Sequence, residues 1–403
     1  MENLKLKRRG FIGGLAGIAG TLGLAHIPLQ GEAYQQDEHT VAEHKFLTKP
    51  YLQNPLPGEI TIRFITNKPT YSWVEYGTDE QLGHKAEAFK LGLVEANSRI
   101  YSIALKNLEP GKRYYYKVFS KDFKKYDPYK IVYGETIETD IYNFTAPDIE
   151  KDDFSMLVMN DIHDRPKSIG HLIKLNGSRP YDLVFFNGDM FNYQTDETQI
   201  LKNMIEPCTE AFASRIPFMY VRGNHETRGK FARNLADYFE NKEKRQYFSF
   251  RRGQAFFICL DTGEDKIDDH KEYSGLAAFD AYREEQAVWL TNELKSKAFK
   301  KAKYKIVLMH IPHYNSKEAH GMLHCRKLFG ELLNKHKIDL MLCGHTHRHG
   351  LYTAKKGQHD YPMIIGGGPK EGERTLIRLE VNSTKLMVQV LDDKGTQLYN
   401  LNV

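Results

Sequence analysis

Beyond residue 153 the sequence alternates short apolar runs with longer amphipathic stretches, and this alternation limits the possible folds more than any other feature. The apolar runs occupy residues 154–160, 181–188, 217–223, 255–261, 303–310 and 337–344. Between them, apolar residues recur at the i, i+3, i+4 spacing of a helix over residues 197–214, 282–296 and 325–337. Strands that are apolar throughout and separated by helices form a sheet covered on both faces. Residues 148–403 are therefore predicted to form an α/β domain, in which two more strand-like runs, 375–381 and 385–391, are expected to finish the second sheet.

Five of these apolar runs end in side chains that commonly bind metal ions. The side chains are those of Asp161 and His163, Asp189, Asn224 with His225 and Glu226, His310, and His345 with His347. Open α/β sheets place their sites at the carboxyl ends of the strands, where these residues stand. One such motif alone is usually a surface or core feature, but five in this order predict a metal centre. A set of carboxylate, amide and imidazole groups without thiolates suits Fe, Mn or Zn, and two ions have enough ligands if Asp189 bridges them.

The preceding segment has a different pattern. Short alternating strands separated by turn residues are expected at 60–66, 72–77, 99–108 and 113–119. The turn Leu-Glu-Pro-Gly-Lys-Arg-Tyr at 108–114 resembles the tyrosine corner of fibronectin type III domains, in which the Tyr hydroxyl bonds to the backbone. A structural role for Tyr114 is therefore expected, and a ligand-binding role is the alternative. Residues 47–147 are predicted to form an all-β, fibronectin type III-like domain, with a charged connection and one strand over 121–150.

The N-terminus has the features of an export signal. Residues 1–33 contain a basic start, an apolar Gly-rich stretch and a small-x-small cleavage candidate at 31–33. Arg8 and Arg9, followed by Gly-Phe-Ile, resemble the twin-arginine motif, which predicts a periplasmic or extracellular bacterial protein. The alternative is an uncleaved membrane anchor, for which the stretch is short and weakly apolar. Residues 34–46 then form a linker, and no stable membrane span is expected once the signal is cleaved.

Charge and cysteine content exclude some classes of protein. The 57 basic and 52 acidic residues nearly balance, so we expect no nucleic-acid partner. The four cysteines show neither C-x-x-C spacing nor the density of a disulfide scaffold.

The strand-end blocks resemble the calcineurin-like metallophosphoesterase family. The matching blocks are Asp161-x-His163, Gly188-Asp189, Gly223-Asn224-His225-Glu226, Val307-x-x-His310 and Gly344-His345-x-His347. More narrowly, the chain resembles the purple acid phosphatases, whose N-terminal domain matches residues 50–66 and 108–118 and whose substrate loop matches 307–316, with His320 ten residues after His310. The resemblance covers about residues 45–370. It implies a metallophosphoesterase β-sandwich flanked by helices and preceded by an all-β, fibronectin type III-like domain.

The resemblance also implies a role for each site residue. The first metal ion would be held by Asp161, His163, Asp189 and His347, and the second by Asp189, Asn224, His310 and His345. His225 would contact the phosphate as an acid or as a stabiliser of the transition state, and His320 would be a second proton donor or phosphate contact. The predicted substrate-binding residues are His225, His320 and the metal ligand Asn224.

The first two blocks depart from the purple acid phosphatase pattern. That family has Asp-x-Gly in the first block, where this chain has His163, and a Tyr three residues after the Gly-Asp aspartate, where this chain has Asn192. Tyr193 lies one residue out of register. Without the tyrosinate that locks in ferric iron, the resemblance implies two divalent or trivalent transition metal ions that are Fe, Mn or Zn.

The predicted function is hydrolysis of phosphate monoesters by in-line attack of a metal-bound hydroxide. A small phosphorylated molecule is the expected partner. One alternative is a phosphodiesterase or nucleotidase of the same fold. The other is a binding or adhesion protein that has kept the scaffold and lost the chemistry.

Overall fold

The computed structural model describes residues 43–241, 243 and 245–403. The predicted signal at 1–33 and most of the linker at 34–46 lie outside the described residues. Within the part of the chain that the structure describes, no helix is both long enough and apolar enough to span a membrane.

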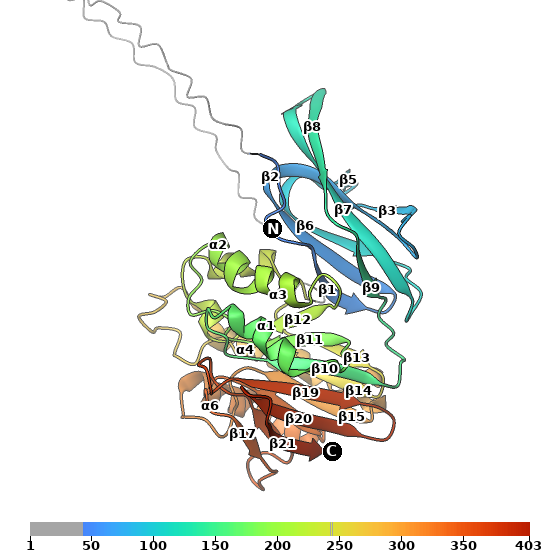
Figure 1. The fold of residues 1–403 in the computed structure, drawn as a ribbon. Helices are drawn as coiled ribbons and strands as arrows, with labels where there is room; N and C mark the ends of the chain where they lie inside the picture. The colour runs from blue at the N-terminus through green and yellow to red at the C-terminus, as the bar shows by residue number, and fades with distance from the viewer. Residues whose placement is uncertain (1–42, 242, 244) are drawn as a thin grey trace, which may run out of the picture. The chain divides into compact units, whose positions relative to one another are not determined.

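The N-terminal strands belong to a 13-stranded sheet that continues into the rest of the chain (Figure 1). These strands are β1 (Tyr51–Leu56), β2 (Glu59–Gly77), β3 (His84–Ala86), β6 (Ala96–Leu105), β7 (Arg113–Asp127), β8 (Lys130–Glu138) and β9 (Tyr142–Thr145), while β4 (Phe89–Lys90) and β5 (Leu93–Val94) form a separate hairpin. β1 pairs in parallel with β12 (Phe218–Val221), so hydrogen bonds cross from the N-terminal segment into the α/β segment. The predicted domain boundary at 147/148 stays a prediction.

The strand predictions in this segment were too few and too short. Residues 60–66 and 72–77 belong to one 19-residue strand, β2, and the stretch 121–150 contains the end of β7 together with β8 and β9. The last four residues of β7, 124–127, and most side chains of β8 are exposed, so the alternation of apolar and polar residues is lost there and these charged strands were predicted as a connection.

The rest of the first sheet has the order β21-β20-β19-β10-β11-β12. Its strands are β10 (Phe154–Met159), β11 (Leu183–Asn187), β12, β19 (Thr375–Val381), β20 (Leu386–Asp392) and β21 (Gln397–Asn402). The two predicted C-terminal strands thus form, as β19 and β20, but the expectation that they finish the second sheet is wrong, because β19 pairs with β10. An apolar pattern shows which face of a strand is buried and gives no information about which sheet edge it joins.

The second sheet has six strands in the order β13-β14-β15-β16-β18-β17. They are β13 (Phe248–Arg252), β14 (Ala255–Leu260), β15 (Tyr304–Met309), β16 (Leu340–Cys343), β17 (Gly350–Tyr352) and β18 (Met363–Ile365). One core cluster contains side chains of both sheets, including Val158 and Phe185 of the first and Phe257, Ile306 and Leu342 of the second. The two sheets therefore pack face to face as a sandwich.

Helices cover the outer face of each sheet. The first sheet packs against α1 (Lys167–Leu175), α2 (Glu197–Ile200), the π-helical turn Leu201–Ile205 and α3 (Glu206–Ala211). The second packs against α4 (Phe279–Glu293), α5 (Lys297–Lys301), α6 (His320–Cys325), the π-helical turn Arg326–Gly330 and α7 (Glu331–Lys335). Short 3₁₀ turns lie at His225–Thr227 and Ala232–Asp237. This arrangement confirms the predicted α/β fold class, a helix-flanked sandwich that follows an all-β segment.

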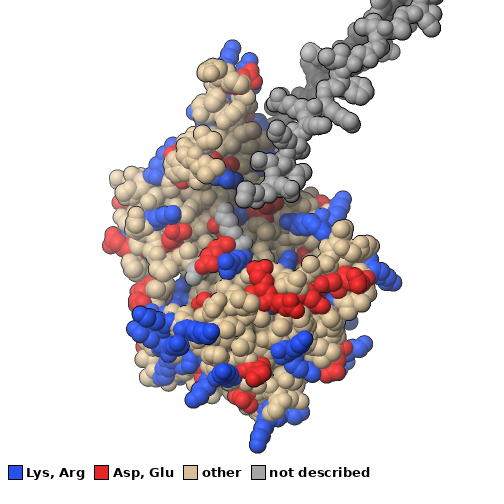
Figure 2. Space-filling view, turned by 180° about the vertical axis from the view of Figure 1, so that it is seen from behind, with Lys and Arg blue, Asp and Glu red and all other residues tan. Residues whose placement is uncertain are grey.

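The space-filling view shows acidic and basic side chains side by side on the face that it draws (Figure 2). This distribution agrees with the near balance of 57 basic and 52 acidic residues in the sequence.

The predicted tyrosine corner is present. The backbone N–H of Glu109 donates to the hydroxyl oxygen of Tyr114 at 3.1 Å, and the Tyr114 ring is buried. We expect Tyr114→Phe to lower the free energy of unfolding by about 0.5–1.5 kcal/mol, the usual contribution of one hydrogen bond. Denaturant unfolding measures the change. Tyr115→Phe is the matched control, since no hydrogen bond of its hydroxyl is found among the described residues, and equal stability of the two variants would contradict the corner's role.

Candidate metal centre

The side chains predicted as metal ligands meet at the carboxyl ends of the central strands. Asp161 follows β10, Asp189 follows β11, His310 follows β15, and His345 and His347 follow β16. Five of the predicted ligands have left-handed backbones, at Asp161 (φ 53°), His163 (φ 47°), Asp189 (φ 55°), His345 (φ 73°) and His347 (φ 56°). Residues other than glycine seldom adopt this conformation, and where they do so at several neighbouring positions a functional constraint is the usual reason.

The first group of potential ligand atoms belongs to Asp161, His163, Asp189 and His347, and all of these atoms lie within 4.8 Å of one another. Asp161 Oδ1 lies 3.2 Å from His347 Nε2 and 3.6 Å from His163 Nε2. The two imidazole nitrogens face each other at 3.1 Å. These four residues are the predicted ligands of the first ion.

The second group belongs to Asp189, His310 and His345. Asp189 Oδ2 lies 3.0 Å from His310 Nε2, and Asn224 Oδ1 lies 2.9 Å from His345 Nδ1. The four predicted ligands of the second ion are thus together as well. Asp189 belongs to both groups, as expected for a bridging carboxylate.

The electrostatics of the two groups favour positive charge. Burial would lower the pKa of His310, but the carboxylates of Asp189 and Asp161 outweigh it and raise that pKa to about 10. Burial would likewise raise the pKa of Asp161, yet the neighbouring imidazoles of His163 and His310 hold it well below its usual value. By contrast, burial and the charge of His310 lower the pKa of His345 to about 4, which favours the neutral, ligating form. The site is therefore suited to cations.

Two further observations fit bound metal ions. Among the described residues, the buried atoms Asp161 Oδ1 and His310 Nε2 have no partner with hydrogen-bonding geometry. Buried polar atoms are rarely left without a partner unless water or an ion fills that role. In addition, a Cβ on Gly188 would lie 2.5 Å from His310 Nδ1, so only glycine leaves space for this imidazole against the loop. The residues present thus fit a dinuclear centre.

Neighbouring polar groups orient the imidazoles. His310 Nδ1 lies 2.8 Å from the carbonyl oxygen of Asn187, so Nδ1 carries the proton and Nε2 is left to ligate. His163 Nδ1 lies 3.1 Å from Asn192 Oδ1. The two departures from the purple acid phosphatase pattern, His163 and Asn192, are therefore in contact: the residue at the tyrosine position holds the extra histidine.

Glu226 organises the loop that carries Asp189. Its fully buried carboxylate accepts hydrogen bonds from the backbone N–H groups of Asp189 (2.9 Å), Met190 (2.6 Å), Phe191 (3.2 Å) and Gly223 (2.6 Å). Burial and the Asp189 carboxylate raise the pKa of Glu226 to about 7. Its place in the Gly-Asn-His-Glu block was visible in the sequence, but its partners 35 to 37 residues earlier were not.

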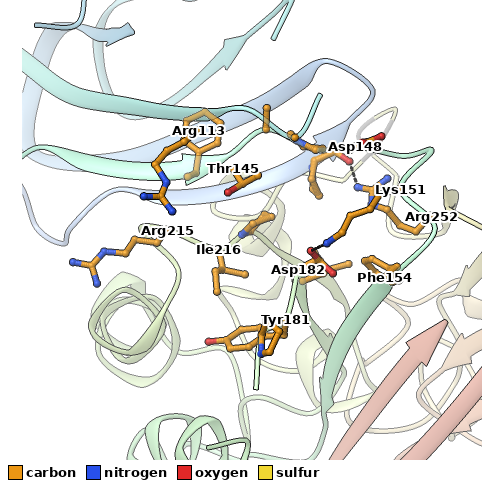
Figure 3. A pocket seen from close by; sticks show the side chains of 18 of the residues that line it. Arg113, Thr145, Asp148, Lys151, Phe154, Tyr181, Asp182, Arg215, Ile216 and Arg252 are labelled. Atoms are coloured by element: carbon orange, nitrogen blue, oxygen red, sulfur yellow. Dashed lines mark hydrogen bonds and ion pairs between the residues drawn. The ribbon is translucent and has the colours of Figure 1, made fainter. Parts of the chain in front are cut away.

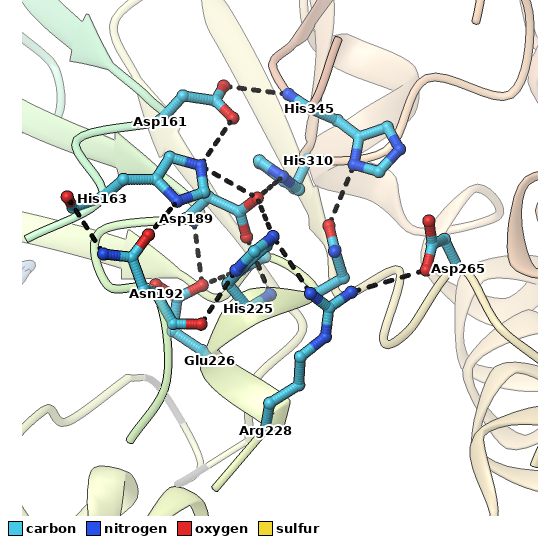
Figure 4. A network of polar contacts seen from close by, with 12 residues as sticks. Asp161, His163, Asp189, Asn192, His225, Glu226, Arg228, Asp265, His310 and His345 are labelled. Atoms are coloured by element: carbon cyan, nitrogen blue, oxygen red, sulfur yellow. Dashed lines mark hydrogen bonds and ion pairs between the residues drawn. The ribbon is translucent and has the colours of Figure 1, made fainter. Parts of the chain in front are cut away.

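His225 lies at the edge of the ligand groups, where it contacts a residue that the sequence did not indicate (Figure 4). Its Nε2 is 4.0 Å from Asp189 Oδ2 and 3.1 Å from Arg228 Nη1. Its Nδ1 lies 2.9 Å from the carbonyl oxygen of Asn192. Burial lowers the pKa of His225.

His320 begins helix α6 and contacts a different carboxylate. Its Nε2 lies 2.8 and 2.9 Å from the two carboxylate oxygens of Asp280, and His324 Nδ1 lies 3.0 Å from one of them. These three side chains form a third group of potential ligands, separate from the two that share Asp189. The polar contacts of His320 with described residues include none of the seven predicted metal ligands. Its substrate role stays a prediction.

A cavity of about 390 Å³ lies elsewhere, between the N-terminal strands and the start of the α/β segment (Figure 3). Arg113, Tyr181, Arg215 and Arg252 line it, together with the ion pair of Lys151 and Asp182 at 3.1 Å. None of the predicted site residues lines this cavity.

Comparison with known proteins agrees with the geometry. Residues 154–349 match the calcineurin-like phosphoesterase family. Probable purple acid phosphatase 20 of Arabidopsis thaliana is 24% identical over 360 residues, which cover 80% of this chain and 74% of that protein. Acid phosphatase type 7 of Mus musculus is 25% identical over 335 residues, covering 72% of this chain and 67% of that protein.

Solved structures share the fold. The purple acid phosphatase PPD1 from yellow lupin seeds has a TM-score of 0.66 at 17% identity, covering 88% of this chain and 73% of its own. PhoD has a TM-score of 0.58 at 13% identity, covering 89% of this chain and 91% of its own. Residues 154–349 thus match the calcineurin-like phosphoesterase family, and this match together with the acid phosphatase relatives indicates that the chain is a phosphoric ester hydrolase.

Proposed function

We propose that the protein is an exported phosphomonoesterase with two transition metal ions. The observation that carries this proposal is the pair of ligand groups that share Asp189. Relatives named as acid phosphatases support the choice of monoesters over diesters.

In this proposal Asp161, His163, Asp189 and His347 hold the first ion, and Asp189, Asn224, His310 and His345 hold the second. The ions are Fe, Mn or Zn, because the ligands are oxygens and imidazole nitrogens without a thiolate. Bound ions of this kind supply the positive charge that stabilises a phosphoryl group and activates water.

Three residues bind and orient the substrate, and one of them, Asn224, also holds the second ion. Asn224 presents its side-chain oxygen beside His345, within 2.9 Å of Nδ1, and the neighbouring His225 projects to the edge of the same groups. We assign His225 to the phosphate contact, as acid or as stabiliser of the transition state. His320 is assigned a second contact with the substrate.

Export is part of the proposal because residues 1–33 have the features of a twin-arginine signal. A fusion of these residues to a reporter that is active only outside the cytoplasm tests it, with Arg8→Lys and Arg9→Lys together as the control that should block export. Unchanged reporter activity in that double variant would contradict the twin-arginine assignment.

The function is tested by metal analysis and a substrate panel. Mass spectrometry should find close to two transition metal ions per chain after reconstitution with Mn, Fe or Zn. The panel should compare monoesters, diesters and polyphosphate across pH, and monoesters should give the largest kcat/KM. A preference for diesters would instead favour the phosphodiesterase or nucleotidase. If the intact chain bound no metal and hydrolysed none of the substrates, a binding protein would be favoured.

His225→Asn should keep both metal ions and lower kcat about 10²–10³-fold, the usual effect of removing one group that stabilises developing charge. The reason is that His225 lies beside the ligand groups, while none of the metal ligands changes. Steady-state kinetics together with metal analysis checks the result. His171→Asn is the control, since His171 pairs with Asp393 on another part of the molecule, and wild-type kcat in His225→Asn would contradict the assigned role.

A further inference from the structure

Arg228 lies beside the candidate centre and has no role in the assignments above. Its Nη1 is 3.1 Å from His225 Nε2, and that nitrogen is 4.0 Å from the shared carboxylate of Asp189. The guanidinium is therefore one imidazole ring away from the metal-ligand groups (Figure 4). Arg228 is only 7% exposed, so its contact with His225 is made by a buried side chain.

The guanidinium is held rigidly from the opposite side. Arg228 Nε and Nη2 each donate to one oxygen of Glu264 at 2.7 Å, in the bidentate geometry that fixes an arginine most firmly. Glu264 is fully buried and also accepts from the hydroxyl of Tyr273 at 2.6 Å and the backbone N–H of Asp265 at 2.8 Å. Asp265 Oδ1 lies 3.5 Å from Nη2. Glu264 and Asp265 thus contact Nε and Nη2 of Arg228, and Nη1 is left facing His225.

The remaining hydrogen-bonding capacity of Arg228 points to an anion. A guanidinium has two N–H groups on each terminal nitrogen, and Nη1 has only the His225 contact among the described residues. His225 Nδ1 lies 2.9 Å from the carbonyl oxygen of Asn192, so the Nε2 edge of the ring is the one that faces Arg228. An oxygen that enters beside His225 would thus meet an Nη1 donor already oriented toward it.

We infer that Arg228 is a specificity-determining residue that selects dianionic phosphate monoesters over monoanionic diesters. This inference rests on the proposed function. A monoester has three non-bridging oxygens and a second negative charge, whereas a diester replaces one of these oxygens with an ester group. A fixed guanidinium forms charge-assisted hydrogen bonds with the additional anionic oxygen and gains less from a diester.

The test compares two esters with the same leaving group. Wild-type protein and the variants are assayed with para-nitrophenyl phosphate and with methyl para-nitrophenyl phosphate. Arg228→Lys keeps the charge but loses the bidentate geometry, and the double variant Arg228→Gln with Glu264→Gln avoids a buried, unpaired carboxylate. We expect kcat/KM for the monoester to fall about 10²-fold, as for loss of one oriented donor, and kcat/KM for the diester to fall less than about fivefold.

The control is Arg251→Gln. Arg251 on β13 has the same bidentate pairing, with Glu150 at 2.8 and 2.8 Å, but contacts no site residue, so both esters should be hydrolysed as by the wild type. Equal losses for the two esters in the Arg228 variants, or no loss, would overturn the inference.

Binding of inorganic phosphate separates this inference from the proposed function. Calorimetry on the metal-loaded protein should show weaker phosphate binding in the Arg228 variants by about tenfold, a typical effect of losing one charge-assisted contact. If the wild type hydrolyses neither ester, the proposed function fails and phosphate binding alone decides the role of Arg228. Unchanged phosphate affinity in the variants would then overturn that role.

Discussion

Replacing Asp189 by Asn is expected to remove bound metal and to lower turnover by at least about 10³-fold, more than the loss of a single stabilising donor. The carboxylate belongs to both ligand groups, with Oδ2 lying 3.0 Å from His310 Nε2 and 3.6 Å from His163 Nε2. The amide has no charge and only one oxygen, so it cannot bridge two cations in the same way. Metal content by mass spectrometry and kcat on a monoester measure the two effects.

Asp339→Asn is the matched control for this prediction. Asp339 accepts a hydrogen bond from the backbone N–H of Lys305 at 2.7 Å, at the ends of β15 and β16 that lie opposite the ligands. That variant should keep its metal and its turnover. Two metal ions per chain and wild-type kcat in Asp189→Asn would show that Asp189 does not bridge the centre.

The α/β segment could be predicted well because its strands are apolar on both faces. Each of the runs from 154–160 to 337–344 contains a strand of one of the two sheets, and the helical spacing located α2, α3, α4 and α7 but neither α1 nor α5. Sheet membership was less predictable: β19 and β20 belong to the first sheet, where they lie between β21 and β10, against expectation. Periodicity describes the surroundings of one segment, whereas pairing depends on partners more than 200 residues apart.

The same limit applies to the candidate site. The seven predicted ligands are brought together because the strands before them are neighbours within each sheet and the two sheets pack face to face. The groups that support them could not be predicted. Asn192 beside His163 and Glu264 beneath Arg228 are paired across loops, and no spacing along the chain indicates such contacts. Arg228 lies only three residues after His225, but no motif in the sequence assigned it to the site.

Replacing Glu226 by Leu is expected to lower the free energy of unfolding by about 4 kcal/mol or more. The change leaves four buried backbone N–H groups without their acceptor, and each buried, unpaired group costs about 1–3 kcal/mol. Denaturant unfolding of the metal-free protein measures this loss. The loop that carries Asp189 also loses its support, so the affinity for metal should fall about 10–100-fold, as when other groups that orient metal ligands are removed.

Two further variants separate the hydrogen bonds from the change of residue type. Glu226→Gln keeps the shape and one accepting oxygen but directs an amide N–H₂ group at N–H donors, so its stability should lie between those of the wild type and Glu226→Leu. Glu210→Leu removes a carboxylate whose side chain is 60% exposed and should change the unfolding free energy by less than about 0.5 kcal/mol. If Glu226→Leu were as stable as Glu210→Leu, the buried carboxylate would not be what holds the Asp189 loop in place.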